Sequence, residues 1–230
     1  TPCDGTRPSD LLGRSEPANL RWVTIMLTPV SHVSAIKPQI AKVRKDLRNL
    51  AARLRRKDAR ADNLRMFGAF ESDWYYPHHV PRLSGYKRRQ LEDIGFDYTG
   101  SEVWFPHLHV LIDLGGASEY RFRELLERKW PGYRRVDFKT LDASKTLTQN
   151  VQNLMGYTLK CKHRYDIDPF RSETASTVRW PADVVEKYHV HLQENGGFAM
   201  LRFHLRPTKS DKTFAEHEPD YIDDYMPVVI

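Results

Sequence analysis

Two hydrophobic periods alternate along the chain and predict its secondary structure. In some segments β-branched and aromatic residues are dense and several alternate with polar residues, which is typical of strands. In others apolar residues recur three and four positions apart, which is typical of amphipathic helices. The predicted strands cover residues 20–28, 64–73, 104–113, 132–141 and 198–205. The predicted helices cover residues 34–61, 118–129, 144–163 and 182–194.

The order of these segments predicts the fold class. From residue 20 it runs β-α-β-β-α-β-α, with short connections that favour pairing between strands close in sequence. We expect an α+β domain over residues 19–206, with a largely antiparallel central sheet and helices packed on it. Its core is expected to span residues 20–165, and residues 182–206 to add a C-terminal helix and strand.

Four segments show neither period. Residues 1–18 are interrupted by prolines and glycines and predict a tail or linker. Residues 74–102 predict an irregular insertion, which either closes over a substrate or decorates the fold; long loops in compact domains are more often functional than idle. Residues 166–181 are also predicted to be irregular. Residues 207–230 form an acidic C-terminal tail.

Charge narrows the class of partner only slightly. The chain has 36 Lys and Arg against 30 Asp and Glu, which gives a formal net charge of +6. This charge favours a polyanion such as nucleic acid as partner, but basic proteins without such a partner are also common. The polar face of the 34–61 helix is almost entirely basic. Such a face is usually solvated, with phosphate contact as the minority interpretation. The candidate DNA-binding residues are Arg44, Lys45, Arg48, Arg134 and Lys162.

The cysteines and the hydropathy indicate the compartment. Cys3 and Cys161 are the two cysteines, and they provide neither a disulfide framework nor a CxxC zinc site, as expected of a reducing compartment. No apolar run in the sequence approaches a membrane-spanning length, and we expect no signal peptide before the domain. We expect a cytoplasmic protein without a membrane partner.

The predicted strand at residues 104–113 carries the first candidate chemistry. It contains His107 and His109 within the apolar run WFPHLHVLID. Because strand side chains alternate, both histidines point to one face and Leu108 to the other. Two imidazoles on one face can converge on a metal ion or a phosphate. The alternative is a pair of ordinary half-buried histidines.

A carboxylate and a tyrosine extend this pair to a candidate site. Glu71 lies near the end of the 64–73 strand, and two imidazoles with one carboxylate suit Mg²⁺ or Mn²⁺ beside a phosphate. Tyr157 and Lys160 are three residues apart on a predicted helix and share a face. A nearby ammonium lowers the pKa of a phenol and stabilises charge in the transition state, which makes a tyrosine a better nucleophile.

These motifs, taken in chain order, resemble those of the HUH endonuclease superfamily. The chain shows IMLT at residues 25–28, Phe70-Glu71, FPHLHVLI at residues 105–112 and YTLK at residues 157–160. Within the superfamily it is most similar to plasmid rolling-circle replication initiators, because the tyrosine follows the histidine pair, whereas in relaxases it precedes the pair. The likeness covers roughly residues 20–165 and implies an RRM-like palm, the sheet already expected.

The resemblance also implies roles. His107 and His109 are expected to bind Mg²⁺ or Mn²⁺, with Glu71 as third ligand. Tyr157 is expected to cut single-stranded DNA at a replication origin, leaving a 5′-phosphotyrosine and a free 3′-OH, with Lys160 assisting by charge. The implied partners are the origin DNA, with or without a hairpin, and a separate host helicase and polymerase in a prokaryotic cytoplasm.

The chain differs from members of this superfamily at the residues that carry out the second, terminating cleavage. Position 153 is Asn, where some relatives have a carboxylate, and Tyr165 follows Tyr157 by eight residues, too far along the chain for a two-tyrosine helix. We therefore expect a single-tyrosine enzyme. The sequence has no GxxxxGK[ST] motif and hence no P-loop motor.

Other interpretations stay open. A transposase could share the same catalytic core, a non-catalytic RRM-like module could bind nucleic acid, and a zinc hydrolase is disfavoured because no third His or Cys is suitably spaced. His189 and His191 fall in a predicted helix, where they diverge, so we expect surface residues. The adjacent His78 and His79 are not expected to share a metal unless a loop brings their rings together.

Overall fold

The computed structural model describes residues 15–95, 102–150, 152, 163–171 and 173–206. Its strands are β1 (Leu20–Met26), β2 (Arg65–Tyr75), β3 (Val103–Asp113), β4 (Val136–Thr140), β5 (Arg164–Ile167), β6 (Ser176–Arg179) and β7 (Arg202–Leu205). Its α-helices are α2 (Ile36–Lys57), α3 (Gly85–Asp93), α4 (Glu119–Lys129) and α6 (Ala182–Glu194). Short 3₁₀ turns occupy Pro17–Asn19, Val33–Ala35, Ala59–Asn63, Pro77–Arg82 and Gly197–Leu201.

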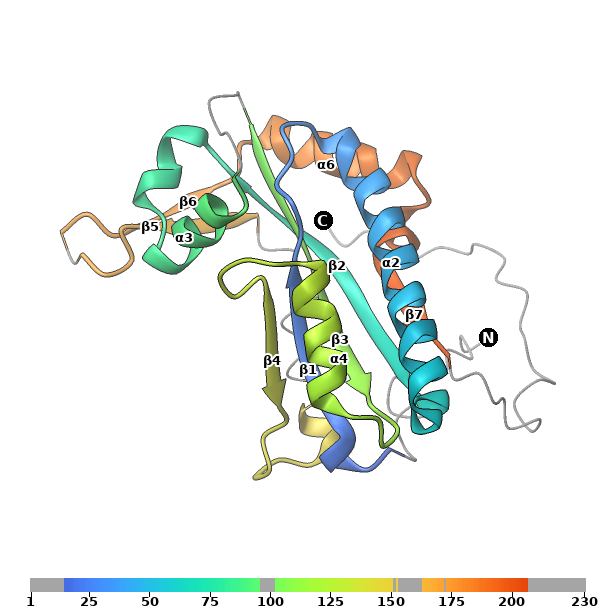
Figure 1. The fold of residues 1–230 in the computed structure, drawn as a ribbon. Helices are drawn as coiled ribbons and strands as arrows, with labels where there is room; N and C mark the ends of the chain where they lie inside the picture. Colours follow the sequence, from blue (N-terminus) through green and yellow to red (C-terminus); the bar gives the residue numbers. More distant parts are fainter. Residues whose placement is uncertain (1–14, 96–101, 151, 153–162, 172, 207–230) are drawn as a thin grey trace.

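Five strands form one sheet in the order β4-β1-β3-β2-β7, and every neighbouring pair is antiparallel. Helices α2 and α4 lie side by side on one face of this sheet, with α6 at one end (Figure 1). An ion pair between Lys129 of α4 and Asp46 of α2, 3.0 Å long, joins the two helices. The predicted α+β class with a largely antiparallel sheet is confirmed.

β3 is the central strand, and every residue in it is buried. Its apolar run supplies side chains to both faces of the sheet, which explains why no polar alternation marks it. Pro106 has no N–H to donate, and central strands usually exclude proline. Here it lies one residue beyond the β1–β3 ladder, whose last pair is Met26 with His107.

The two faces of the sheet have different coverings. Leu108, Val110 and Ile112 point toward α2, α4 and α6 and belong to the main hydrophobic core. The opposite face carries a small apolar cluster of Leu20, Trp22 and Leu111. His107 and His109, which alternate with the core residues of β3, lie on this second and less covered face.

Three local predictions were wrong. The segment 74–102 contains the end of β2 and helix α3, which sequence periodicity missed because only two residues of that helix are buried. The segment 166–181 contains most of a two-stranded hairpin, β5 with β6, which is too short for a clear alternation. The segment 198–205 is a strand only from Arg202, because a 3₁₀ turn precedes it.

A helix that spans a membrane needs about 20 apolar residues. Within the part of the chain that the structure describes, no helix combines that length with that hydrophobicity.

Candidate metal centre

Adjacent strands bring the three predicted ligands together. Glu71 on β2 lies directly opposite His107 on β3, and His109 follows on the same face. The Glu71 Oε2 atom is 3.3 Å from His107 Nε2 and 3.7 Å from His109 Nε2. One ligand atom from each residue lies within 4.8 Å of the other two, and among the described residues this is the one group of three or more side chains so placed.

Each imidazole is oriented by a bond at its other nitrogen. His107 Nδ1 lies 3.3 Å from the carbonyl oxygen of Phe105, to which it donates, so this nitrogen points away from the site. His109 Nδ1 lies 3.0 Å from the Thr24 hydroxyl, and Trp22 stacks on the ring at 5.6 Å between centroids. Both Nε2 atoms therefore face the carboxylate, and such outer contacts are what fix metal-binding histidines.

The spacing suits a metal ion. Ligands about 2.1 Å from a common ion lie about 3.0–3.4 Å apart in octahedral or tetrahedral geometry. The separations of Glu71 Oε2 from the two Nε2 atoms, 3.3 and 3.7 Å, are close to this range. The group could therefore hold a divalent ion, and it does not select which one.

Electrostatics at the site favour one neutral imidazole. Burial and the neighbouring His107 lower the pKa of His109 to about 3, so its ring is neutral at pH 7. Burial also opposes protonation of His107, but its hydrogen bond to Glu71 and the charge of Asp73 outweigh burial and raise its pKa. The negative charges that favour a proton on His107 also favour a metal cation in place of that proton.

A polar network beside the site joins β2 to α3. Asp73 Oδ2 accepts hydrogen bonds from the Tyr75 hydroxyl at 2.6 Å and from Lys87 Nζ at 3.0 Å, and Lys87 Nζ lies 2.7 Å from that hydroxyl. Although burial opposes ionisation, the Lys87 ammonium keeps the pKa of Asp73 below its usual range. The network fixes α3 against the strand that carries Glu71.

Thr24, Phe105 and Asp73 are supporting residues that sequence reasoning missed. Asp73 had a usable signal, since it is two residues from Glu71 and must share its face in a strand. Thr24 could be found only from the pairing of β1 with β3, which sets it opposite His109.

The predicted basic residues divide between two places. Arg44, Lys45 and Arg48 lie on α2, on the face of the sheet opposite to the histidines. Arg44 donates to the carbonyl oxygens of Met200, at 2.6 Å, and Arg202, so it ties α2 to the start of β7. Arg134, by contrast, lies in the exposed loop before β4.

The predicted nucleophile region lies outside the described residues. Tyr157, Lys160 and Lys162 fall there, as do Asn153 and Cys161. The described residues 147–150 and 152 are helical, as expected for the start of the 144–163 helix. Leu147 packs against the apolar cluster of Leu20, Trp22 and Leu111, on the histidine face.

His191, His79 and Tyr165 have structural surroundings. His191 is buried on the apolar face of α6, so its predicted surface position was wrong; it lies seven residues, two helical turns, after the buried Val184. His79 Nδ1 is 2.7 Å from the hydroxyl of Tyr165. Tyr165 itself is buried on β5, where that hydroxyl also accepts from the Tyr76 N–H.

Comparison of the chain with family models, curated proteins and solved structures gives no match.

Proposed function

We propose that the chain is a metal-dependent endonuclease and strand transferase that nicks and rejoins single-stranded DNA through Tyr157, and that it initiates rolling-circle replication. The observation that carries this proposal is the convergence of Glu71, His107 and His109 on the less covered face of the sheet. The sequence order of these ligands and of the YxxK segment supports the same assignment.

The placement of the next helix adds support. Its described first turn packs on the face that carries the histidines, through Leu147. The segment that leads along the sequence toward Tyr157 and Lys160 therefore starts on the face that carries the proposed metal ligands.

The chemistry follows from these roles. Glu71, His107 and His109 would hold Mg²⁺ or Mn²⁺, and the bound ion would polarise the phosphoryl oxygens of the scissile phosphate. The Tyr157 oxygen loses its proton to solvent and attacks phosphorus. The bond from phosphorus to the 3′ oxygen breaks, and that oxygen takes up a proton to become a free 3′-OH. Lys160 stabilises the negative charge that develops. Attack by a 3′-OH on the phosphotyrosine reverses the reaction and joins strands.

The test uses a pool of random single-stranded oligonucleotides with Mn²⁺ and with EDTA. With a 3′ label, the cut strand is expected to migrate with the protein in SDS, because the 5′-phosphate side stays attached. With a 5′ label, the strand is expected to be released and to be extended by a polymerase. Sequencing the attached strands then gives the nick site.

Two tyrosine variants make the assignment specific. Tyr157→Phe is expected to abolish the adduct, and Tyr165→Phe to leave it, because the Tyr165 hydroxyl is occupied in the core. DNA binding without any adduct in Mg²⁺, Mn²⁺ or Zn²⁺ contradicts the proposal and favours a non-catalytic binding module. Cleavage without an adduct contradicts it in favour of a metal-activated water.

A further inference from the structure

Two tyrosines and two arginines form an exposed cluster beside α3. Tyr86 of α3 and Tyr133 meet edge to face, with ring centroids 6.0 Å apart. The Arg89 guanidinium lies over the Tyr133 ring at 4.2 Å, and that of Arg134 lies 5.5 Å from the Tyr86 ring. Tyr86 remains 37% exposed. We call these four residues the tyrosine–arginine platform.

The platform is held in place by hydrogen bonds from α3. Gln90, which is buried, donates to the carbonyl oxygen of Arg134 at 2.9 Å and to the Tyr86 hydroxyl at 3.1 Å. Asp93 accepts from the N–H of Tyr133 at 2.8 Å. Arg134 has a φ of 46°, a left-handed conformation that is unfavourable for a residue with a side chain. These contacts keep the loop in a shape that its sequence alone disfavours.

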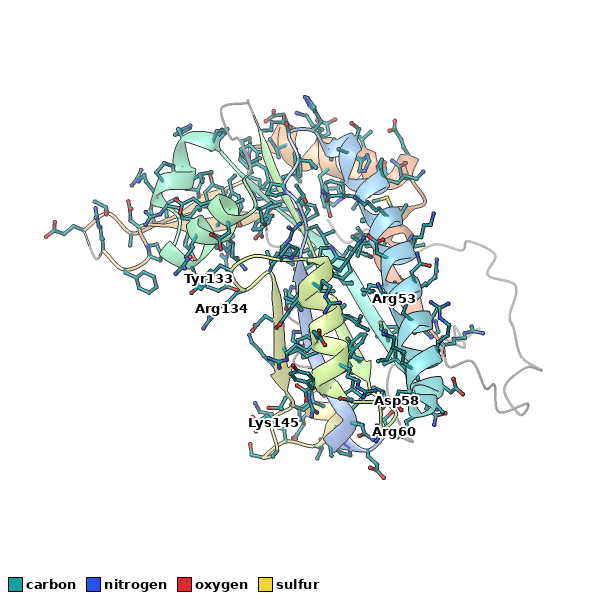
Figure 2. The ribbon with its side chains drawn as sticks, viewed as in Figure 1. Arg53, Asp58, Arg60, Tyr133, Arg134 and Lys145 are labelled. Atoms are coloured by element: carbon teal, nitrogen blue, oxygen red, sulfur yellow. The ribbon has the colours of Figure 1, made fainter. Side chains whose placement is uncertain are left out.

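The platform lies on the same side of the sheet as the candidate metal centre, because α3 contacts Asp73, which shares a strand face with Glu71. Burial and, after it, the charge of Asp137 raise the pKa of Tyr86. Asp137 on β4 pairs with Thr24 on β1, which pairs with His109 on β3, so the three share one cross-strand row. Lys87, the residue after Tyr86, belongs to the network around Asp73 on β2. Figure 2 shows Tyr133 and Arg134 close to α3, where the chain leads into β4.

We propose that the tyrosine–arginine platform binds an unpaired base and the adjoining phosphate of the single-stranded DNA whose scissile phosphate lies at Glu71, His107 and His109. The inference rests on the proposed function and names the surface that holds the substrate strand. Aromatic rings stack on the faces of unpaired bases whatever their sequence, and Arg contacts phosphate or stacks as a planar cation.

Duplex DNA does not fit this chemistry as well. Its bases are stacked on one another, so two rings on one surface cannot stack on them without unpairing a step. The long basic face of α2 lies on the other side of the sheet, away from the histidines. Several basic residues were predicted to contact DNA. Among those that the structure describes, Arg134 is the residue that lies beside aromatic rings on which an unpaired base can stack.

The test measures binding of a fluorescent poly(dT) oligonucleotide in EDTA, so that no cutting occurs, over a series of salt concentrations. Tyr86→Leu and Tyr133→Leu are each expected to weaken binding about tenfold with an unchanged salt slope. Arg134→Gln is expected to weaken binding and to reduce the slope of log affinity against log salt by about one. Binding of a duplex of equal length is expected to change little in the two tyrosine variants.

Matched controls separate stacking from misfolding. Tyr86→Phe keeps the ring and is expected to bind within about twofold of wild type. Tyr120→Leu removes a tyrosine that is 77% exposed on α4, and Arg53→Gln removes an arginine on α2, which Figure 2 shows on the other side of the molecule; neither is expected to change binding.

The outcome is independent of catalysis. Wild-type binding by Tyr86→Leu and Tyr133→Leu overturns the platform even where the covalent adduct forms. Equal losses for single-stranded and duplex DNA also overturn it. If no adduct forms but these variants lose affinity for single-stranded DNA specifically, the endonuclease activity is contradicted and the binding role of the platform is supported.

Discussion

Gly68 sets the distance between the two strands that carry the ligands. A Cβ atom at this position would lie 2.2 Å from the carbonyl oxygen of His109 and 2.8 Å from Val110 Cα, both backbone atoms that cannot rotate away. Normal contact begins near 3.4 Å. Replacing Gly68 with alanine therefore requires β2 and β3 to separate by about an ångström beside the metal centre.

The cost follows from this displacement. Inserting one methyl group into a packed interior costs about 1–3 kcal/mol, and stretching ladder hydrogen bonds adds to it, so we expect Gly68→Ala to lose about 2–3 kcal/mol of unfolding free energy. In urea this shifts the midpoint by about 1 M for a chain of this size. Because Glu71 and the histidines are on the two separated strands, Mn²⁺ affinity measured by calorimetry is expected to fall by at least about tenfold.

A second glycine provides the control. Gly85 begins α3, and a Cβ there would meet nothing within 4 Å. Gly85→Ala is expected to change the unfolding free energy by less than about 0.5 kcal/mol and to leave Mn²⁺ binding unchanged. If Gly68→Ala unfolds at the wild-type midpoint and binds Mn²⁺ as tightly, the strands do not approach as described and the ligand geometry drawn from them is wrong.

Two further predictions concern Arg44 and Asp58. Arg44→Leu removes the donor to the carbonyl oxygens of Met200 and Arg202, so we expect the unfolding free energy to fall by about 1–3 kcal/mol and amide exchange in β7 to become faster. Arg48→Leu, one turn later on an exposed face of α2, is expected to change neither quantity. Equal stability of the two variants contradicts the structural role of Arg44. The hydrogen bond from Arg60 lowers the pKa of Asp58 to about 2. Since the ionised carboxylate is the stabilising form, its contribution is present above about pH 4 and is lost as the pH falls toward 2. The difference in urea midpoint between wild type and Asp58→Asn is therefore expected to shrink between pH 5 and pH 2, and a constant difference contradicts it.

The sequence predicted the parts of the fold that depend on local pattern. The all-apolar run of β3 and the long amphipathic α2 have unambiguous periods, and the shared face of His107 and His109 follows from strand geometry alone. The pairing of Glu71 with His107 does not. It depends on the register between β2 and β3, which is set by contacts between residues 36 positions apart.

Other features depend on tertiary contacts that no local pattern records. α3 buries only Gln90 and Leu91, and polar contacts hold it in place, among them the ion pair of Lys87 with Asp73 on β2. The basic face of α2 is plain in the sequence, but the side of the sheet that it occupies is not. Because α2 lies on the opposite face of the sheet, Arg44, Lys45 and Arg48 are separated from the histidines. Arg134 is therefore the better candidate for a DNA contact near the histidines.

The proposed function requires that Glu71, His107 and His109 together hold the ion that positions the scissile phosphate. Its most direct test is anomalous diffraction from crystals grown with Mn²⁺ and a single-stranded oligonucleotide bound to the Tyr157→Phe variant. We predict one Mn²⁺ peak about 2.2 Å from Glu71 Oε2 and from both histidine Nε2 atoms, with a phosphate oxygen completing its coordination and residue 157 facing the phosphorus. Bound DNA with no Mn²⁺ peak at these three residues, or a peak ligated elsewhere, contradicts the account.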